Sequence, residues 1–151
     1  MDKDIFPQMT EVMKVSCDKK SFFHEKILYR YLIRKIEGWS VTNFLVMENI
    51  KSYALYAVTD FTTLFLKDVE HNGKYIDALG IICDKNAEAF QFQYYNWPVI
   101  LPDELVGKYK DGKIEKIIVM SFWHENEIID GLIKKGVLLN DIISFVSVLY
   151  S

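Results

Sequence analysis

The sequence contains little arginine and little cysteine. Arg30 and Arg34 are the only arginines among 18 basic residues, and the others are lysines. Because the planar guanidinium group is the preferred partner of phosphate and guanine, this shortage argues against a nucleic-acid-binding protein. The two cysteines, Cys17 and Cys83, form no CxxC motif and have no histidine at metal-ligand spacing. Two isolated thiols are more typical of a reducing compartment than of a disulfide scaffold, and we expect no metal site.

Long apolar runs are also missing from the sequence. No stretch approaches the roughly 18 apolar residues that a membrane span requires. The start, MDKDIFPQ, is acidic and lacks the apolar segment of a signal peptide. We therefore expect a cytoplasmic protein without a membrane span. Half of the 151 residues are hydrophobic, which is enough to build the core of one domain.

The chain divides into three parts by its hydrophobic pattern. Residues 1–20 carry no clear period and are expected to form an N-terminal arm, loosely attached or a short helix. Residues 21–49 form a helical extension, in which one helix ends at Gly38 and Ser40 caps a second, short helix. Residues 50–151 alternate between short apolar runs and amphipathic stretches, which is typical of βαβ units with a parallel sheet.

The expected elements of residues 50–151 are strands over 53–58, 79–83, 90–94, 98–100, 114–120 and 141–150, and helices over 61–68, from Pro102, and over 123–135. The alternation of Phe90, Phe92 and Tyr94 with glutamines predicts an edge strand with one wet face. Together these elements predict an α/β, Rossmann-like, doubly wound domain preceded by N-terminal helices. Its mostly parallel sheet has about five strands, and the order 3-2-1-4-5 fits their number.

The turn after the first strand is where such a fold binds phosphate. A dinucleotide-binding turn reads GxGxxG, and here Ala57, Thr59 and Thr62 stand at the three glycine positions. Thr59 adds atoms where the backbone must approach a pyrophosphate. Asp60 places a carboxylate near the helix N-terminus that would otherwise hold the anion. We therefore predict that the protein does not bind NAD(P) in the usual mode, and we assign no cofactor.

Four more residues are expected at the same edge of the sheet. Asp84 and Lys85 follow the second strand, where a dinucleotide-binding fold keeps its ribose-binding acid, although Asp84 also suits a simple turn. Ser121 and His124 follow the third strong strand, as candidate ligand-binding groups or as a helix cap. His124-Glu125 is not part of a zinc HExxH motif, because Ile128 stands at the second histidine position.

The N-terminal helices carry more aromatic residues than one buried stripe needs, namely Phe22, Phe23, Tyr29, Tyr31 and Trp39. Such a surplus favours a homodimer or a protein partner on this side of the molecule.

Several segments together resemble a Rossmann-like domain of bacterial surface-polysaccharide biosynthesis proteins. They are EKILYRYLIRKIEGWSVTNFLVMENIKSYALYAV, GIICDKN, WPVILPDEL, IEKIIVMSFWHENEIIDGLIKKG and IISF, within residues 23–148. The resemblance implies a Rossmann-like fold that binds a nucleotide or a nucleotide-activated sugar. Asp84 and Asn86 match the family's DxN motif, whereas Ala57, Thr59 and Thr62 depart from its glycines. The resemblance implies no catalytic residues for this chain.

Three functions remain open on the sequence. The first is a non-catalytic accessory or interaction domain derived from a nucleotide binder and linked to cell-envelope polysaccharide biosynthesis. The second is a sugar-nucleotide-binding or sugar-modifying enzyme, in which the Thr59 and Thr62 hydroxyls replace loop amides beside the other candidate site residues. The third is a degraded methyltransferase-type domain. A cleft beside Thr59 and Asp84 would favour the second, and a filled surface there would favour the first.

Overall fold

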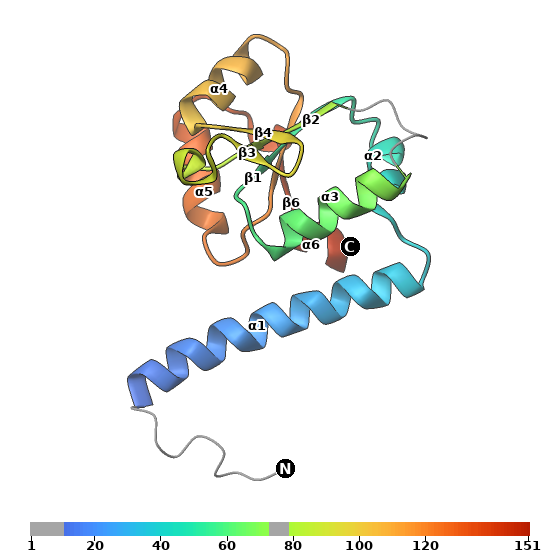
Figure 1. Cartoon of the computed structure of the whole chain (residues 1–151), viewed down its shortest axis with the longest axis vertical. Coiled ribbons are helices and arrows are strands. Elements are labelled where there is room, and N and C mark those ends of the chain that lie inside the picture. The colour runs from blue at the N-terminus through green and yellow to red at the C-terminus, as the bar shows by residue number, and fades with distance from the viewer. Residues whose placement is uncertain (1–10, 73–78) are drawn as a thin grey trace.

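The structure is a computed structural model that describes the backbone of residues 11–72 and 79–151. Side chains are described for residues 19–71 and 80–151. A long N-terminal helix lies along one side of an α/β domain, and the remaining helices surround a twisted sheet (Figure 1).

In the described part of the chain, six strands form one sheet in the order β3-β4-β2-β1-β5-β6. The strands are β1 (Ser52–Tyr56), β2 (Leu79–Cys83), β3 (Gln93–Tyr94), β4 (Trp97–Ile100), β5 (Lys116–Val119) and β6 (Ile142–Ser144). All neighbours pair in parallel except β3 and β4. The parallel strands therefore run β4-β2-β1-β5-β6, an order of the 3-2-1-4-5 type, and the predicted Rossmann-like doubly wound fold is confirmed.

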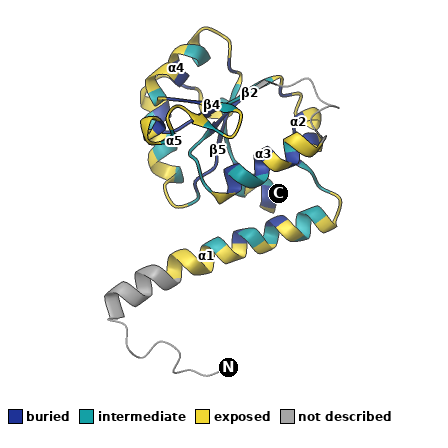
Figure 2. Ribbon diagram, in the orientation of Figure 1, coloured by how far each residue is buried: buried dark blue, intermediate teal, exposed yellow. Residues whose placement is uncertain are grey.

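Two helical layers cover the sheet. The helices are α1 (Glu11–Ile36), α2 (Val41–Met47), α3 (Asp60–Asn72), α4 (Pro102–Lys110), α5 (Glu125–Lys134) and α6 (Phe145–Tyr150), with short 3-10 turns η2 (Ala87–Phe90) and η3 (Leu139–Asp141). Tyr53 and Leu55 of β1 pack with α1, α2, α3 and α6, whereas Ala54 packs with α4 and α5. The central strands are buried on both faces, while α1 keeps an exposed outer side (Figure 2).

The N-terminal helices are attached through a buried carboxylate on α3. The Asp68 carboxylate lies 2.6 Å from the Lys35 ammonium group and accepts hydrogen bonds from the Tyr31 hydroxyl and the Val41 amide. Burial, and then the nearby Asp68 charge, raise the pKa of Tyr31. The helical extension therefore shares the core of the domain. The predicted cap is also confirmed, because the Ser40 side chain accepts a hydrogen bond from the Asn43 amide.

Helix α1 begins earlier than the sequence pattern indicates. It starts at Glu11 and runs without a break through Ser21, so residues 11–20 are helical and belong to the same helix as residues 21–36. This segment contains no proline or glycine, and a helix can continue through such residues without an apolar stripe. Residues 1–10 of the predicted arm lie outside the described residues.

The predicted final strand over 141–150 is wrong in its second half. Strand β6 ends at Ser144, whose side chain accepts a hydrogen bond from the Ser147 amide and so caps helix α6. Phe145 and Leu149, four residues apart, then face the core from one side of the helix. A continuous apolar run does not distinguish a strand from a short buried helix, and here the cap decides.

The predicted strand over 90–94 is also mostly wrong. Phe90 ends the turn η2, and Gln91 and Phe92 have positive φ angles of 55° and 59°, so the backbone is not extended there. Gln93–Tyr94 alone pairs with β4, in an antiparallel manner. The expected position at the edge of the sheet is correct.

None of the helices in the described ranges combines the length and apolar character needed to cross a membrane.

Candidate functional site

The candidate site lies where the sheet reverses its strand order. Strand β1 is flanked by β2 on one side and by β5 on the other, and the loops that follow β1 and β5 meet at the carboxyl edge of the sheet. Ligands of doubly wound folds bind at this position. Two adjacent cavities open here and share Thr59, Ser121 and His124 in their linings.

The loop after β1 keeps the backbone shape of a glycine turn without its glycine. Ala57 has a φ of 89°, a conformation that a side chain disfavours and glycine adopts freely. Its amide donates to the Cys83 carbonyl at 2.8 Å, and the Val58 amide donates to the Asp84 carboxylate at 2.9 Å. The Thr59 amide donates to the Thr62 hydroxyl at 3.0 Å. All three amides therefore already have partners within the protein.

The two threonines hold the loop closed from within. The Thr62 hydroxyl donates to the Ala57 carbonyl at 2.6 Å, and the Thr59 hydroxyl donates to the Met120 carbonyl at 3.0 Å. Thr62 is completely buried and lines neither cavity, whereas Thr59 lines both. Thr62 is therefore a loop-stabilising residue, and Thr59 is the threonine that lines the cavities.

Asp60 does not close the loop in the way that we expect from the sequence. Its side chain is 74% exposed, and its carboxylate lies 3.2 Å from the Nε2 atom of His24 on α1. Among the described residues it has no hydrogen bond with a backbone amide. Asp84 takes that role instead, since its carboxylate accepts from the Val58 amide and, at 2.7 Å, from the Asn86 amide.

Asp84 thus stabilises its own turn and also holds the loop after β1 in place, and we call this second contact the Asp84 clamp. Its bond to the Asn86 amide is the turn that the sequence offers as the alternative, and its bond to Val58 fastens the neighbouring loop. Asp84 is buried, and Lys85 beside it is exposed at the cavity edge.

The first cavity, which we call the α5 cavity, has a volume of about 510 Å³. Its apolar floor comes from Ile128 and Leu132 of α5, and its polar groups include Lys85, Lys135 and Tyr56. Burial, followed by the nearby Cys83 and Asp84, raises the pKa of Tyr56 to about 12. The Tyr56 hydroxyl is therefore protonated at neutral pH and can donate a hydrogen bond to a ligand.

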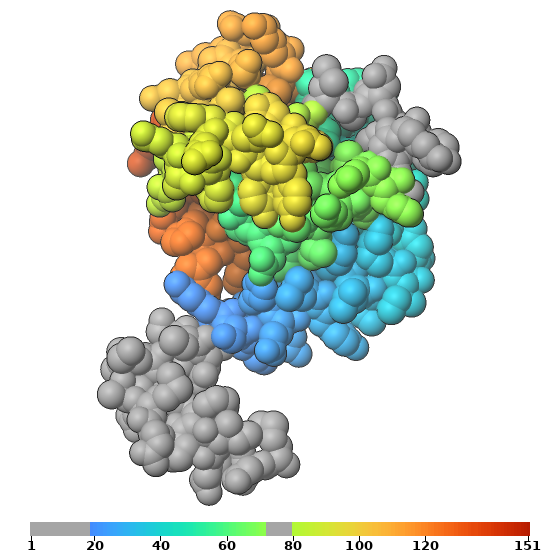
Figure 3. Space-filling model, in the orientation of Figure 1, coloured from blue at the N-terminus to red at the C-terminus, as the bar shows by residue number. Residues whose placement is uncertain are grey.

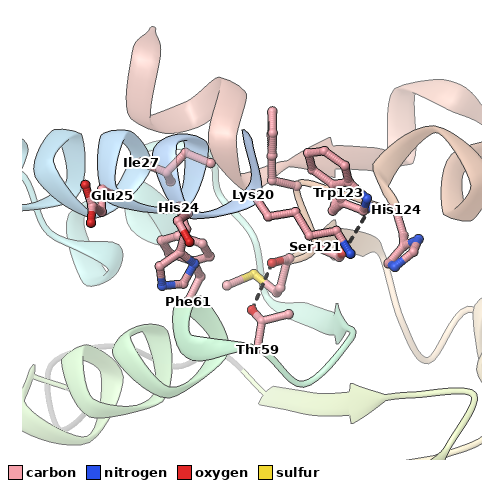
Figure 4. A pocket seen from close by; sticks show the side chains of 12 residues that line it. Lys20, His24, Glu25, Ile27, Thr59, Phe61, Ser121, Trp123 and His124 are labelled. Atoms are coloured by element: carbon pink, nitrogen blue, oxygen red, sulfur yellow. Dashed lines mark hydrogen bonds between the residues drawn. The ribbon is translucent and has the colours of Figure 1, made fainter. Parts of the chain in front are cut away.

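The second cavity, which we call the α1 cavity, has a volume of about 440 Å³ and lies between α1 and the sheet edge. Figure 4 shows Lys20 and His24 on α1 opposite Ser121 and Trp123, which follow β5. The Lys20 ammonium group lies 5.2 Å from the centre of the Trp123 ring, which is 45% exposed. In the space-filling view the blue residues of α1 lie across the base of the domain, against the green residues of α3 (Figure 3).

Ser121 and His124 form a hydrogen-bonded turn at the junction of the two cavities, and the N-cap residue of α5, His124, makes no side-chain capping bond. The Ser121 hydroxyl accepts a hydrogen bond from the His124 backbone amide at 3.2 Å, directly before α5 begins. The His124 ring is exposed, and its Nδ1 lies 3.7 Å from the Glu127 carboxylate. The serine and the imidazole therefore form no nucleophile–base pair, although both line the cavities.

The chain matches no protein-family model, no curated protein and no solved structure.

Within the described residues, no group of three histidine, cysteine or acidic side chains could hold a metal ion. Cys83 is a free, buried thiol, and burial raises its pKa, so it is unsuited to act as a nucleophile. The side chain of Cys17 lies outside the described residues.

The structure brings five of the seven predicted site residues into one cavity lining: Thr59, Asp84, Lys85, Ser121 and His124. The sequence does not predict Lys20 and His24 as site residues, because nothing in the sequence places α1 against the sheet edge. Lys135 directly follows α5 and lies at the opposite end of that helix from His124, so the sequence does not predict it beside the other site residues. The Asp84 bond to the Val58 amide depends on the pairing of β2 with β1, which the sequence does not determine.

Proposed function

We propose that this protein is a non-catalytic accessory domain that binds a nucleotide-activated sugar through side chains, at the site where related folds use loop amides. The observation that carries the proposal is the pair of cavities on either side of Thr59, Ser121 and His124, next to a loop whose first three amides, those of residues 57–59, already have acceptors within the protein. A cleft with a few converging polar groups on an apolar floor is the usual form of a small-molecule site.

The two cavities offer different chemistry. The α1 cavity presents the exposed Trp123 ring beside a lysine, which suits a flat aromatic group such as a base. The α5 cavity presents Lys85, the Tyr56 hydroxyl and Ser121, which suit an anion and sugar hydroxyls. A ligand with a base at one end and a sugar at the other matches both.

The non-catalytic part of the proposal rests on the candidate reactive groups. Ser121 accepts from a backbone amide, Cys83 is buried, and Asp84 is held by two loop amides. The link to cell-envelope polysaccharide assembly comes from the resemblance of residues 23–148 to domains of that pathway.

A pair of glycine variants tests the site. Gly131 of α5 lines the α5 cavity, and a Cβ atom added there meets no atom within 4 Å, so we expect the Gly131→Leu side chain to extend into the cavity. Gly107 of α4 is exposed and equally unhindered, so Gly107→Leu is a matched control. Both changes remove a glycine from a helix and are expected to raise stability by up to about 1 kcal/mol.

Thermal unfolding is measured against nucleotide-activated sugars, free nucleotides, NAD(P) and S-adenosylmethionine. A ligand at about a hundredfold its Kd adds about 2.7 kcal/mol, which is a rise in Tm of about 5–10 °C for a chain of this size. We expect a nucleotide sugar to produce this rise in the unchanged protein and in Gly107→Leu but not in Gly131→Leu. No rise with any nucleotide sugar at millimolar concentration, or an equal rise in both variants, would refute the proposal.

A sugar-modifying enzyme is the alternative, and two observations favour it. The α5 cavity beside Thr59 and Asp84 is the cleft that we expect of a sugar-nucleotide-binding enzyme, instead of the filled surface expected of an accessory domain without a ligand. The exposed His124 ring stands at the junction of both cavities, with Glu127 close enough to orient it. Turnover of a bound nucleotide sugar that is lost in His124→Gln, with binding retained, would replace the accessory function by this one.

A further inference from the structure

A third cavity, which we call the β6 cavity, lies away from the candidate site. It has a volume of about 500 Å³, shares no residue with the other two cavities, and lies beside the edge strand β6. Its lining comes from α1, the segment between α1 and α2, α2, β6 and α6, and includes Arg34, Trp39, Phe44 and Met47. Its size is similar to that of the two cavities at the sheet edge.

Arg34 is the unusual residue of this cavity. Its side chain is half-buried, and its Nε atom is shielded from solvent without a hydrogen-bond partner. Within the described part of the chain, no acceptor binds any of its N–H groups and no carboxylate lies within 4.0 Å of it. By contrast, Arg30, one turn earlier on α1, donates from Nε to the Leu149 carbonyl at 2.8 Å.

A partly buried arginine whose Nε–H has no acceptor is suited to bind an anion. Covering part of a guanidinium group without giving its donors a partner costs free energy, which a bound carboxylate or phosphate would recover. The Arg34 guanidinium lies 6.0 Å from the centre of the Trp39 ring, and contact with an aromatic ring restrains the side chain. A restrained planar group with free donors favours a ligand that accepts two hydrogen bonds at once.

The remaining lining adds an apolar requirement. Trp39 and Phe44 are half-buried, and Met47 is 83% exposed, with a flexible side chain that adapts to the shape of a ligand. Glu48 also lines the cavity and disfavours a second negative group near it. We propose that the β6 cavity binds an amphiphilic organic anion, with its carboxylate or phosphate on Arg34 and its apolar body against Trp39, Phe44 and Met47.

The proposal is independent of the function proposed above, because the two sites have no residue in common. The test uses phenyl phosphate as the probe, with phenol and inorganic phosphate as its two halves. Proton–nitrogen NMR spectra of the full chain record the Arg34 Nε–H and Trp39 indole signals during each titration. We expect phenyl phosphate to shift both signals saturably and to bind about tenfold more tightly than either half.

Four variants define the site. Arg34→Gln is expected to weaken phenyl phosphate binding about tenfold or more, since it removes a charge-assisted pair of hydrogen bonds. Lys26→Gln removes the same charge from an exposed position of the same helix and is expected to leave the affinity unchanged. Ser147→Trp, at an exposed lining position, keeps Arg34 but narrows the cavity, and it should also abolish binding. Glu48→Gln should tighten binding.

Several results would overturn the proposal. The first is an absence of saturable shifts at Arg34 and Trp39 up to 10 mM phenyl phosphate, which is about the weakest Kd expected of a specific site. The second is an equal loss of affinity in Arg34→Gln and Lys26→Gln. The third is weaker binding of phenyl phosphate in Glu48→Gln. Shifts confined to the α5 cavity around Lys85 would also overturn it, and would assign the anion to the site at the sheet edge. Circular dichroism of each variant confirms that it is folded.

Discussion

Replacing Asp84 with alanine tests how the loop after β1 is closed. The Asp84 carboxylate is buried and accepts hydrogen bonds from the Val58 amide at 2.9 Å and the Asn86 amide at 2.7 Å. A hydrogen bond to a charged group contributes about 1.5–3 kcal/mol. Asn86 is exposed and water can replace its partner, so we assign about 1 kcal/mol to that bond and about 2 to the bond from half-buried Val58.

Asp84→Ala is therefore expected to lower the free energy of unfolding by about 3 kcal/mol, which is a fall in Tm of about 6–12 °C. Asp84→Asn keeps one acceptor oxygen and should lose about half as much. Asp60→Ala is the matched control: Asp60 follows the same loop but is 74% exposed, so its change is expected to stay within about 0.5 kcal/mol.

Urea unfolding at pH 7, followed by far-ultraviolet circular dichroism, measures all three variants. A second readout is pyrophosphate binding, which we expect Asp84→Ala to gain weakly, because the variant frees the Val58 amide and removes a competing anion. If Asp60→Ala loses more stability than Asp84→Ala, the sequence-based assignment of Asp60 is right and the clamp is wrong.

Three further changes test the packing and electrostatics described above. Ala57→Gly should raise the free energy of unfolding by about 0.5–1 kcal/mol, because glycine adopts a φ of 89° without strain and this gain exceeds the extra entropy of the unfolded chain. A lower free energy of unfolding in urea would contradict this expectation. Gly80→Ala should destabilise by about 1–3 kcal/mol, since a methyl group there overlaps the Trp97 ring, and an unchanged Tm would show that the ring can move. The hydrogen bond from Lys116 lowers the pKa of Asp141 in the folded protein. This carboxylate therefore stabilises the fold fully above its unfolded pKa of about 4, and the stabilisation is lost as the pH falls through the lower pKa of the folded state. Asp141→Asn should thus cost up to about 1 kcal/mol at pH 7 and progressively less below about pH 4, and a constant difference from pH 7 to pH 2 would refute the assignment.

Much of the sheet could be predicted because its central strands are buried on both faces. The continuous apolar runs at 53–58, 79–83 and 114–120 leave no other interpretation within βαβ units. The strand order could not be read from the sequence, because several orders are compatible with the same succession of strands and helices. Residues 141–150 resisted prediction because apolar content alone fits a strand or a helix, and the Ser144 cap that decides between them is a single hydroxyl.

The candidate site was predicted in position but not in detail. Parallel strands bring their carboxyl ends to one edge, so Thr59, Asp84 and Ser121 could be expected together. Which aspartate fastens the loop depends on side-chain direction, which spacing does not give. The contribution of α1 to the second cavity depends on how a helix docks against the domain, and no local pattern encodes that.

The Asp68 carboxylate couples the attachment of α1 to the domain with that of α2. Lys35 on α1 and the Val41 amide on α2 both donate to it, so the departure of either helix removes a hydrogen bond from a buried carboxylate. Local opening of α2 and of the second half of α1 is therefore coupled into one cooperative unit with the sheet. Of the α1 residues that line the α1 cavity, Ile27 is buried in the same core, whereas Lys20, Ser21 and Glu25 are exposed. Only this N-terminal part of the cavity wall can therefore loosen while the fold stays intact.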